Sequence, residues 1–434
     1  MISGSSVRLF SREVCHLALR VGLGLALIVQ VGAVLVSSAG AQSVKPGRLV
    51  IVGGALEADN ESVYRAILDG RSGTGPFCVI PTAGATPETG MATPVAAFDR
   101  WGGAGTAKGV LISVNKPETA RDPAVVAQLR ACSGFFFIGG IQTRVSAAFR
   151  PDGNSTPAYD ALMQRWREGA VVSGSSAGAA IMSDPMIASG VSANAFTRGV
   201  KQLPVGAAAD VDDATAGLTM TQGLGLFPAA LADQHFLSRG RFGRLLVALV
   251  DLDQYDLAFG VDENTALVVD GNSVRAVGAS GVTVFDERGA TRSATRSGRS
   301  EAGIVMHLMG AGDRFDLTTR TLTQMANKSP LPQATGDSAI VLAPKNAFAA
   351  WEFLHVLDRL GRSPQTELSM PVTGGEIIVR KSTGFRAVST AASAAGSAAG
   401  SSAGSSAGSS AGAGVQKTPA GLGMTGLTVE LRRP

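Results

Sequence analysis

The pattern with the clearest chemistry is Gly-Ser-Ser-Ala-Gly at residues 174–178. It follows an apolar run at 170–172 and precedes an apolar stretch, 177–182, that can open a helix. Flanking glycines allow a strained strand-to-helix turn that exposes the central hydroxyl, Ser176, while the amide of Ala177 faces a developing oxyanion. The sequence therefore favours Ser176 as a nucleophile for acyl transfer, although an ordinary glycine turn fits the same five residues.

A serine nucleophile needs a base, and three histidines lie beyond residue 41. His307 stands in an apolar run and His355 in an amphipathic stretch, as packed histidines do. His235 lies in the polar cluster Asp233-Gln234-His235, directly before an expected helix. That setting suits a general base, and it also suits a helix cap.

The third member should be a carboxylate that orients the imidazole. Asp262 and Glu263 follow the apolar run 257–261, and alternation alone leaves the choice between them open.

Two further features could serve such a site. Gly139-Gly140 follows the apolar run 135–138, so that the amide of Gly140 could donate to an oxyanion, or the pair could be a plain tight turn. Arg239, Arg241 and Arg244 follow His235 and suggest a substrate rich in carboxylates, because guanidinium binds carboxylate with two parallel bonds; a solvated helix face is the alternative. The chain has no HExxH, CxxC or GxxxxGK[ST] pattern and no dinucleotide fingerprint, and we expect no metal or other cofactor.

Short apolar runs alternate with amphipathic ones in the first half of the chain. The runs at 49–52, 77–80, 110–114, 135–138 and 170–172 predict strands, and those at 61–68, 94–101, 123–130 and 157–167 predict helices. This rhythm predicts an α/β fold with a doubly wound, mostly parallel sheet, whose site lies at the carboxyl ends of the strands.

The second half predicts a β-rich C-terminal extension. After a helical stretch at 236–252, strands are expected near 265–277, 304–309 and 376–380, with a hairpin turn at Asp270-Gly271-Asn272 and a helix over 346–360. We predict a catalytic region at 42–286, an extension at 287–388, an Ala/Gly/Ser low-complexity loop at 389–416 and a C-terminal segment at 417–434 whose strand returns to the main sheet.

Residues 1–41 have the layout of a secretory signal peptide, with arginines, a short apolar run and cleavage expected near Ala41. An uncleaved anchor is the alternative. Without this segment the formal net charge falls from +4 to about +2, which gives no indication of a nucleic-acid or membrane surface. Cys78 and Cys132 could pair in an exported protein, but both adjoin apolar runs, which favours two buried free thiols.

Taken together, these motifs resemble the cyanophycinase branch of the S51 serine peptidases. The resemblance rests on Gly139-Gly140-Ile141-Gln142 and on the segments 174–187, 223–226, 233–245 and 260–266. It implies a flavodoxin-like fold related to the class I glutamine amidotransferases, usually as a homodimer. It also implies Ser176 as nucleophile, His235 as base and Glu263 as orienting acid, with substrate contacts from Gln142, Asp233, Gln234, Arg239, Arg241 and Arg244.

The substrate implied by the resemblance is cyanophycin, a poly-aspartate that carries arginine on each β-carboxyl and is cut to β-aspartyl-arginine dipeptides. Its carboxylates and guanidiniums suit a site that contains arginines and an aspartate. We therefore expect a secreted serine exopeptidase. The alternatives are an aspartyl dipeptidase of the same family and a non-catalytic secreted binding protein on the same fold.

Overall fold

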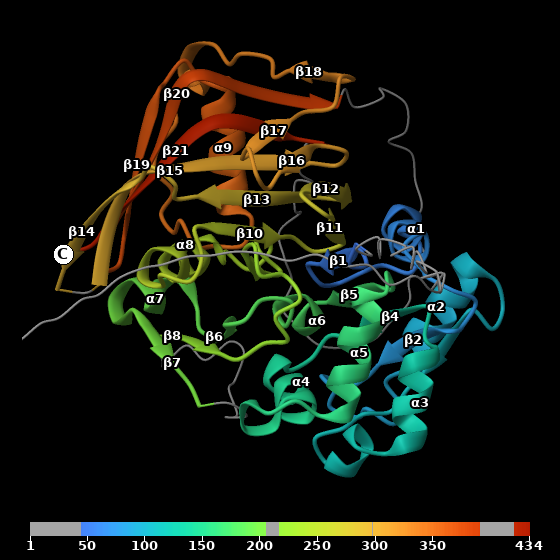
Figure 1. Ribbon diagram of the computed structural model, residues 1–434. Coiled ribbons are helices and arrows are strands. Elements are labelled where there is room, and N and C mark those ends of the chain that lie inside the picture. The colour runs from blue at the N-terminus through green and yellow to red at the C-terminus, as the bar shows by residue number, and fades with distance from the viewer. Residues whose placement is uncertain (1–44, 205–216, 297, 391–420) are drawn as a thin grey trace, which may run out of the picture. The chain divides into compact units, whose positions relative to one another are not determined.

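The computed structural model describes residues 45–204, 217–296, 298–390 and 421–434 (Figure 1). The expected signal peptide and most of the Ala/Gly/Ser loop lie outside these residues. The described residues belong to one compact unit. The fold is mixed α/β, with a parallel-rich central sheet and an additional β-rich C-terminal region.

The central sheet contains four of the five strands predicted in the first half of the chain. Its order is β17-β16-β12-β11-β1-β5-β4-β2-β3, in which the five strands from β1 to β3 pair in parallel. The strands are β1 (Leu49–Val52), β2 (Phe77–Ile80), β3 (Ala107–Gly109), β4 (Gly134–Phe137), β5 (Val171–Ser175), β11 (Thr265–Asp270), β12 (Ser273–Gly278), β16 (Arg314–Asp316) and β17 (Thr321–Thr323).

Both faces of this sheet are covered. Along β1, Leu49 and Ile51 point into one apolar cluster, and Val50 and Val52 point into another. The second cluster is completed by α1 (Glu61–Leu68) and α2 (Ala92–Gly102), and the first by α3 (Pro123–Ala131), α4 (Gln142–Phe149), α5 (Pro157–Arg167) and α6 (Ala177–Ala180). Side-chain caps start several helices, since Asn60, Asp122 and Thr156 each accept a bond from a first-turn amide.

Several local elements differ from the expectations, among them the helix expected over 346–360, which begins only at Glu352. Residues 110–114 form no strand, because β3 ends at Gly109 and the buried Val110 and Ile112 lie in irregular chain. Helix α4 was not predicted, since its apolar residues are interrupted by Gln142, Thr143 and Ser146, all of which are nevertheless buried. The stretch 236–252 is helical only from Phe242, as α8 (Phe242–Asp251).

A second sheet joins the end of the predicted catalytic region to the C-terminal extension, in the order β18-β20-β21-β15-β13-β10-β9 (Figure 1). Its strands are β9 (Leu231–Asp233), β10 (Leu257–Val261), β13 (Gly281–Asp286), β15 (Gly298–Gly310), β18 (Lys328–Pro330), β20 (Gly375–Thr390) and β21 (Gly423–Arg432), with β14 (Thr291–Thr295) and β19 (Glu367–Val372) beside β15 and β20. The C-terminal strand β21 therefore belongs to this sheet and not to the parallel one. Helix α9 (Glu352–Arg362) contributes Leu354, Leu357 and Leu360 to the same core.

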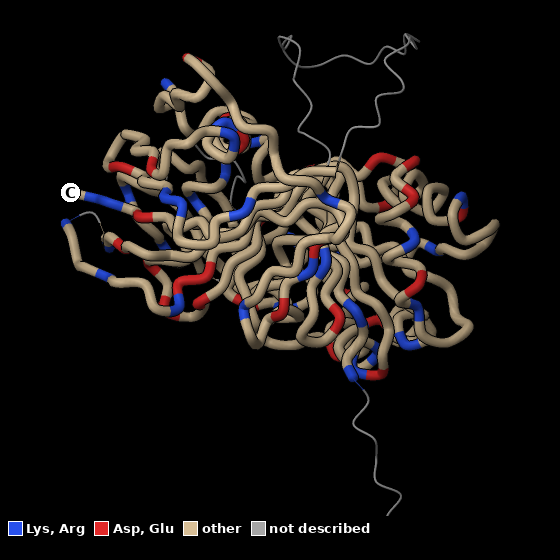
Figure 2. Tube along the Cα trace, turned by 90° about the horizontal axis from the view of Figure 1, so that it is seen from above, with Lys and Arg blue, Asp and Glu red and all other residues tan. Residues whose placement is uncertain are grey.

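The remaining elements are smaller. The strands β6 (Met186–Ser189), β7 (Val200–Gln202) and β8 (Leu218–Thr221) form a third sheet, close to α7 (Ser192–Arg198). The hairpin predicted at residues 270–272 is confirmed between β11 and β12. Figure 2 shows basic and acidic residues mixed along the described chain. Within the described ranges, no helix is long and apolar enough to cross a membrane.

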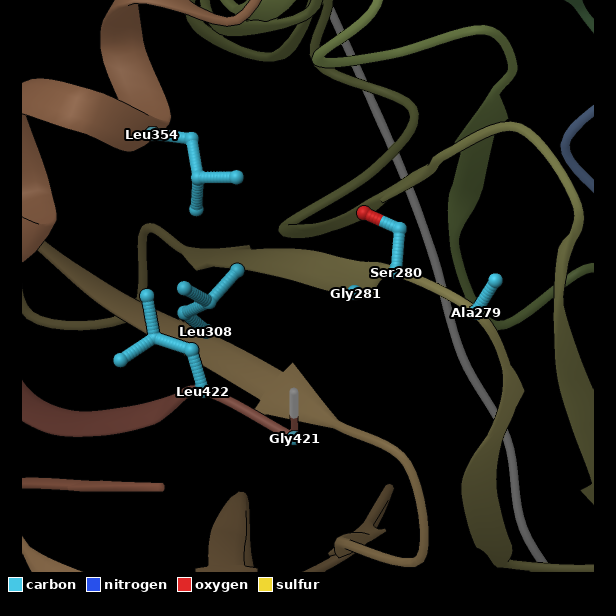
Figure 3. A pocket seen from close by; sticks show the side chains of 7 residues that line it. All are labelled: Ala279, Ser280, Gly281, Leu308, Leu354, Gly421 and Leu422. Atoms are coloured by element: carbon cyan, nitrogen blue, oxygen red, sulfur yellow. The ribbon is translucent and has the colours of Figure 1, made fainter. Parts of the chain in front are cut away.

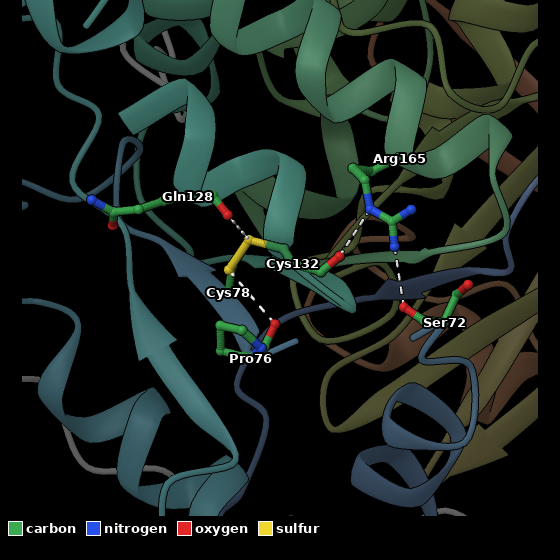
Figure 4. Close-up of a disulfide and its surroundings, with 6 residues drawn as sticks. All are labelled: Ser72, Pro76, Cys78, Gln128, Cys132 and Arg165. Carbon is green, nitrogen blue, oxygen red and sulfur yellow. Dashed lines mark hydrogen bonds between the residues drawn. A yellow bond between two sulfur atoms is a disulfide. The ribbon is translucent and has the colours of Figure 1, made fainter. Parts of the chain in front are cut away.

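Cys78 and Cys132 form a disulfide, contrary to the expectation of free thiols (Figure 4). The bridge joins β2 to the end of α3, with the two Cα atoms 5.8 Å apart. Both residues are buried, so their apolar surroundings gave no indication of the bond. The Arg165 side chain donates beside the bridge to the carbonyls of Cys132 and Ser72.

Candidate active site

Ser176 stands at the sharp turn between β5 and α6. Its backbone has φ 56° and ψ −109°, a strained conformation for a residue with a side chain. The turn is possible because Gly174 and Gly178 touch each other: a Cβ on Gly174 would lie 2.4 Å from the Gly178 carbonyl oxygen. Ser176 is partly exposed while residues 171–175 and 177–180 are buried, so this serine is the accessible residue of the turn.

His235 and Glu263 complete a hydrogen-bonded chain with Ser176. His235 Nε2 lies 2.9 Å from Ser176 Oγ, and His235 Nδ1 lies 2.5 Å from Glu263 Oε1. The carboxylate binds only a protonated Nδ1, which leaves Nε2 of a neutral ring free to accept the serine proton. The hydrogen bond from His235 holds the pKa of Glu263 below its usual value, so that this acid is charged at neutral pH.

The three side chains come from two sheets. Ser176 follows β5 of the parallel sheet, whereas His235 follows β9 and Glu263 follows β10 of the second sheet. Strands β9 and β10 pair in parallel, so the residues after them emerge at the same edge. The expectation of a site at the carboxyl ends of parallel strands applies to both sheets here.

Asp262 and Glu263, the two acids between which alternation left the choice open, have different surroundings. Asp262 is fully buried and accepts hydrogen bonds from the amides of Leu237 and Ser238, while Glu263 is 31% exposed and reaches the imidazole. Burial raises the pKa of Asp262.

The expected oxyanion donors lie on either side of Ser176. Ala177 is the first residue of α6, where an amide has no partner within the helix. Gly140 lies in the turn after β4, and a Cβ on its neighbour Gly139 would come 3.3 Å from the Cβ of Ser176. This turn is held in place by Ile141 N–H and the Arg144 guanidinium, both of which donate to the carbonyl of Ala83.

Two of the residues expected to bind substrate bind each other instead. Arg244 donates to Asp233 through Nε (2.8 Å) and Nη2 (2.6 Å), and both side chains are only 1% exposed. The third nitrogen, Nη1, donates to the carbonyl of Gly190 at 2.7 Å. A substrate has no surface of this pair to contact, and the pair instead ties β9 to α8.

The other expected binding residues are divided between the interior and the surface. Gln142 is buried and donates to the carbonyls of Ile187 and Ala188. Gln234 is also buried, and its Oε1 lies 3.4 Å from Ser176 Oγ. Arg241 is buried and donates to the carbonyl of Gln234. Only Arg239 is exposed, with Nε 4.0 Å from Glu263 Oε1.

Gly54 was missed as a site residue. It follows β1 with φ 112°, and a Cβ there would lie 2.2 Å from Cε1 of His235, so a larger residue would collide with the imidazole. The amide of His235 also donates to the carbonyl of Gly53. The signal that could have found it is the glycine pair Gly53-Gly54 directly after the first apolar run.

Residues 49–277 match the sequence profile of peptidase family S51. The chain belongs to this family. It is 31% identical over 290 residues to the cyanophycinase of Nostoc sp. (strain PCC 7120), an alignment that covers 65% of this chain and 89% of that protein. It is equally similar over 290 residues to the cyanophycinase of Trichormus variabilis, with the same coverage.

Among solved structures, a peptidase from an acI-B1 Actinobacterium is 22% identical and aligns with 56% of this chain and 92% of its own, with a TM-score of 0.40. The S51 match and the cyanophycinase relatives confirm the expected family, and with it a cyanophycinase-like serine peptidase.

Proposed function

We propose that this S51 peptidase is an exported exopeptidase that hydrolyses cyanophycin to β-aspartyl-arginine dipeptides through an acyl-enzyme. The observation that carries the proposal is the chain of contacts from Glu263 through His235 to Ser176, at a strained turn that presents the serine hydroxyl. The similarity to two cyanophycinases supports the substrate.

The first half of the reaction forms an ester. Ser176 Oγ attacks the aspartyl backbone carbonyl and gives its proton to His235 Nε2, while Glu263 stabilises the imidazolium through Nδ1. The amides of Gly140 and Ala177 donate to the oxyanion. The C–N bond then breaks, and His235 returns the proton to the departing amine.

The second half regenerates the serine. A water molecule gives one proton to His235 Nε2 as its oxygen bonds to the ester carbon. The C–Oγ bond breaks, His235 protonates Ser176 Oγ, and the dipeptide leaves with a free carboxylate.

The surface near the site is compatible with this substrate. Each arginyl unit of cyanophycin carries an α-carboxylate, and the exposed Arg239 guanidinium stands next to Glu263 at the edge of the site. The proposal assigns no substrate contact to Asp233 or Arg244, because both side chains are buried. Of the three arginines, Arg239 is the one that a substrate can reach.

The decisive experiment compares Ser176→Ala with Ser175→Ala. Release of β-aspartyl-arginine from cyanophycin should fall below about one hundredth in Ser176→Ala, because the nucleophile is lost. The neighbouring Ser175 lies in β5 and has a buried side chain, so Ser175→Ala should retain activity if it folds. Clearing of cyanophycin agar by Ser176→Ala at the parental rate would refute the assignment.

Two alternatives are separated by further measurements. An aspartyl dipeptidase would cleave short aspartyl peptides and leave the polymer intact. A non-catalytic binding protein would not react with a fluorophosphonate, whereas the proposed enzyme should be labelled at Ser176. We also propose export, a flavodoxin-like core and a homodimer. N-terminal sequencing of the secreted protein should give a start near Gln42. Light scattering should give twice the mass of the mature chain.

A further inference from the structure

Asp262 is a fully buried acid that accepts three hydrogen bonds. Its Oδ1 accepts from the amides of Leu237 (3.1 Å) and Ser238 (3.0 Å), and its Oδ2 accepts from the Ser280 hydroxyl (2.7 Å). A buried carboxylate is costly unless such donors surround it. Its place in the fold therefore depends on these three groups.

The two amides belong to the turn that carries His235. His235 has φ 47°, and its carbonyl accepts from the amide of Arg239, so the chain coils tightly after it. The amides of Leu237 and Ser238 lie at the start of this coil, in the position of first-turn amides that need an acceptor from outside. Asp262 supplies that acceptor from the end of another strand, β10.

The neighbouring residues Asp262 and Glu263 thus hold two different parts of the His235 segment. Glu263 contacts the imidazole, and Asp262 contacts the main chain that directly follows the histidine. If the turn shifted, the ring would lose its alignment between Ser176 and Glu263 even though all three side chains remained. A displacement of about 1 Å in such a group can reduce catalysis by about 10²-fold.

Ser280 links this acid to the C-terminal region. It precedes β13, its amide donates to Thr265 Oγ1 at 2.8 Å, and it lines a small cavity together with Leu308, Leu354 and Leu422 (Figure 3). The leucine side chains of that lining offer the hydroxyl no acceptor, which leaves Asp262 as its partner.

We propose that Asp262 is a positioning residue for the general base, held in place by Ser280. The proposal rests on the proposed function, in which His235 is that base. Asp262 does not touch the reacting atoms and acts only through the His235 turn.

The test is the rate at which a fluorophosphonate labels Ser176, because a small reagent reports on the Ser176–His235 geometry without any polymer substrate. Asp262→Ala should lower the second-order labelling rate by about 10- to 100-fold. Asp262→Asn should restore most of it, since its Oδ1 still accepts from both amides and its Nδ2 can donate to Ser280 Oγ. Asp262→Leu, which fills a similar volume but accepts no hydrogen bond, should remain slow, and its recovery would mean that packing and not the two amides is the cause.

The matched control is Asp316→Ala. Asp316 Oδ1 also accepts two successive amides, from Thr318 (2.9 Å) and Thr319 (2.7 Å), but at an exposed turn outside the site. Its labelling rate should equal that of the parent protein. The thermal unfolding midpoint of each variant is measured as well, to verify that every variant is folded at the temperature of the labelling experiment.

Parental labelling of folded Asp262→Ala would overturn the proposal, as would equal slowing in Asp262→Ala and Asp316→Ala. If Asp262→Ala does not fold, Ser280→Ala carries the test, with an expected slowing of about threefold or more; a parental rate would then count against the proposal.

A second readout separates this inference from the proposed function. If the parent protein is not labelled at all, the proposed function fails, but the NMR signal of the His235 Nδ1 proton still reports on the ring. That low-field signal should be lost in Asp262→Ala and kept in Asp262→Asn. Its persistence in both variants would overturn the positioning role.

Discussion

Glu263 Oε1 lies 2.5 Å from Nδ1 of His235, on the side of the ring opposite Ser176. This contact fixes which nitrogen faces the serine. Glu263 therefore determines the tautomer of the imidazole as well as supplying a charge. Neutralising this acid should leave the ring in place but change which ring nitrogen carries the proton.

Glu263→Gln should therefore lower kcat by about 10²- to 10⁴-fold with little change in KM, because the amide cannot stabilise the imidazolium. Steady-state kinetics on the polymer or on a soluble peptide give both constants. The control is Glu61→Gln on the exposed face of α1, which should behave as the parent. A rise in KM at constant kcat would instead indicate that Glu263 binds substrate.

Gly54→Ala should abolish most activity by pushing the imidazole from its position, since the new Cβ would come 2.2 Å from Cε1 of His235. A loss of about 10²-fold or more in kcat is expected. Gly103→Ala is the matched control, because Gly103 also has a positive φ, of 95°, but nothing lies within 4 Å of its added Cβ. Equal losses in both variants would mean that backbone strain, and not contact with His235, is the cause.

Arg244→Met should destabilise the fold by about 3–5 kcal/mol, because it leaves the buried Asp233 without its partner. Arg239→Met, at the exposed arginine, should change stability little and raise KM. Urea unfolding and kinetics measure the two effects separately. The prediction would be contradicted if Arg244→Met unfolded at the parental urea concentration and mainly raised KM.

Glu287 should lower the free energy of unfolding as pH rises from about 4.5 to about 7, because burial raises the pKa of this acid from 4.5 to about 7. Burial lowers the pKa of His307 to about 4 and acts in the opposite direction, so the contribution of Glu287 is read from the difference between the parent and Glu287→Gln. Across that window the folded protein keeps a proton that the unfolded chain has released. Glu287→Gln should remove this decrease and stabilise the protein at pH 8 by at least about 1 kcal/mol. Urea unfolding of both proteins at pH 5 and pH 8 checks this, and an identical change in the free energy of unfolding in parent and variant would exclude the contribution of Glu287.

The local elements with strong periodicity could be predicted from the sequence, and those held by distant partners could not. The helix at 157–167 coincides with α5, where Thr156 caps the helix and Pro157 begins it. In contrast, nothing near Leu231 or Leu257 indicates that β9 and β10 belong to a second sheet and not to the parallel one. Their sheet is determined by the pairing of β10 with β13 and, through β13, with β15 and β21. Non-local strand pairing leaves little trace in a local pattern.

The same contrast applies to the site. The Ser176 turn has a compact signature, and the histidine could be inferred from its neighbours. The pattern of residues left the acid open between Asp262 and Glu263, and only the family resemblance indicated Glu263. The role of Arg244 could not, because an arginine that pairs inside the protein and one that faces a substrate look alike in a sequence. Nor could the bond between Cys78 and Cys132, since burial beside apolar strands is common to paired and free cysteines.

Strand β21 lies between β15 and β20, and its register with β20 runs from Gly423 to Arg432. A chain break introduced between Thr390 and Gly421 would leave every one of these partners intact. The protein could thus be produced as two polypeptides that reassemble through strand pairing. In the sheet, β21 is connected through β15 and β13 to β10, the strand that precedes Glu263, so the short fragment would complete the sheet that positions this acid.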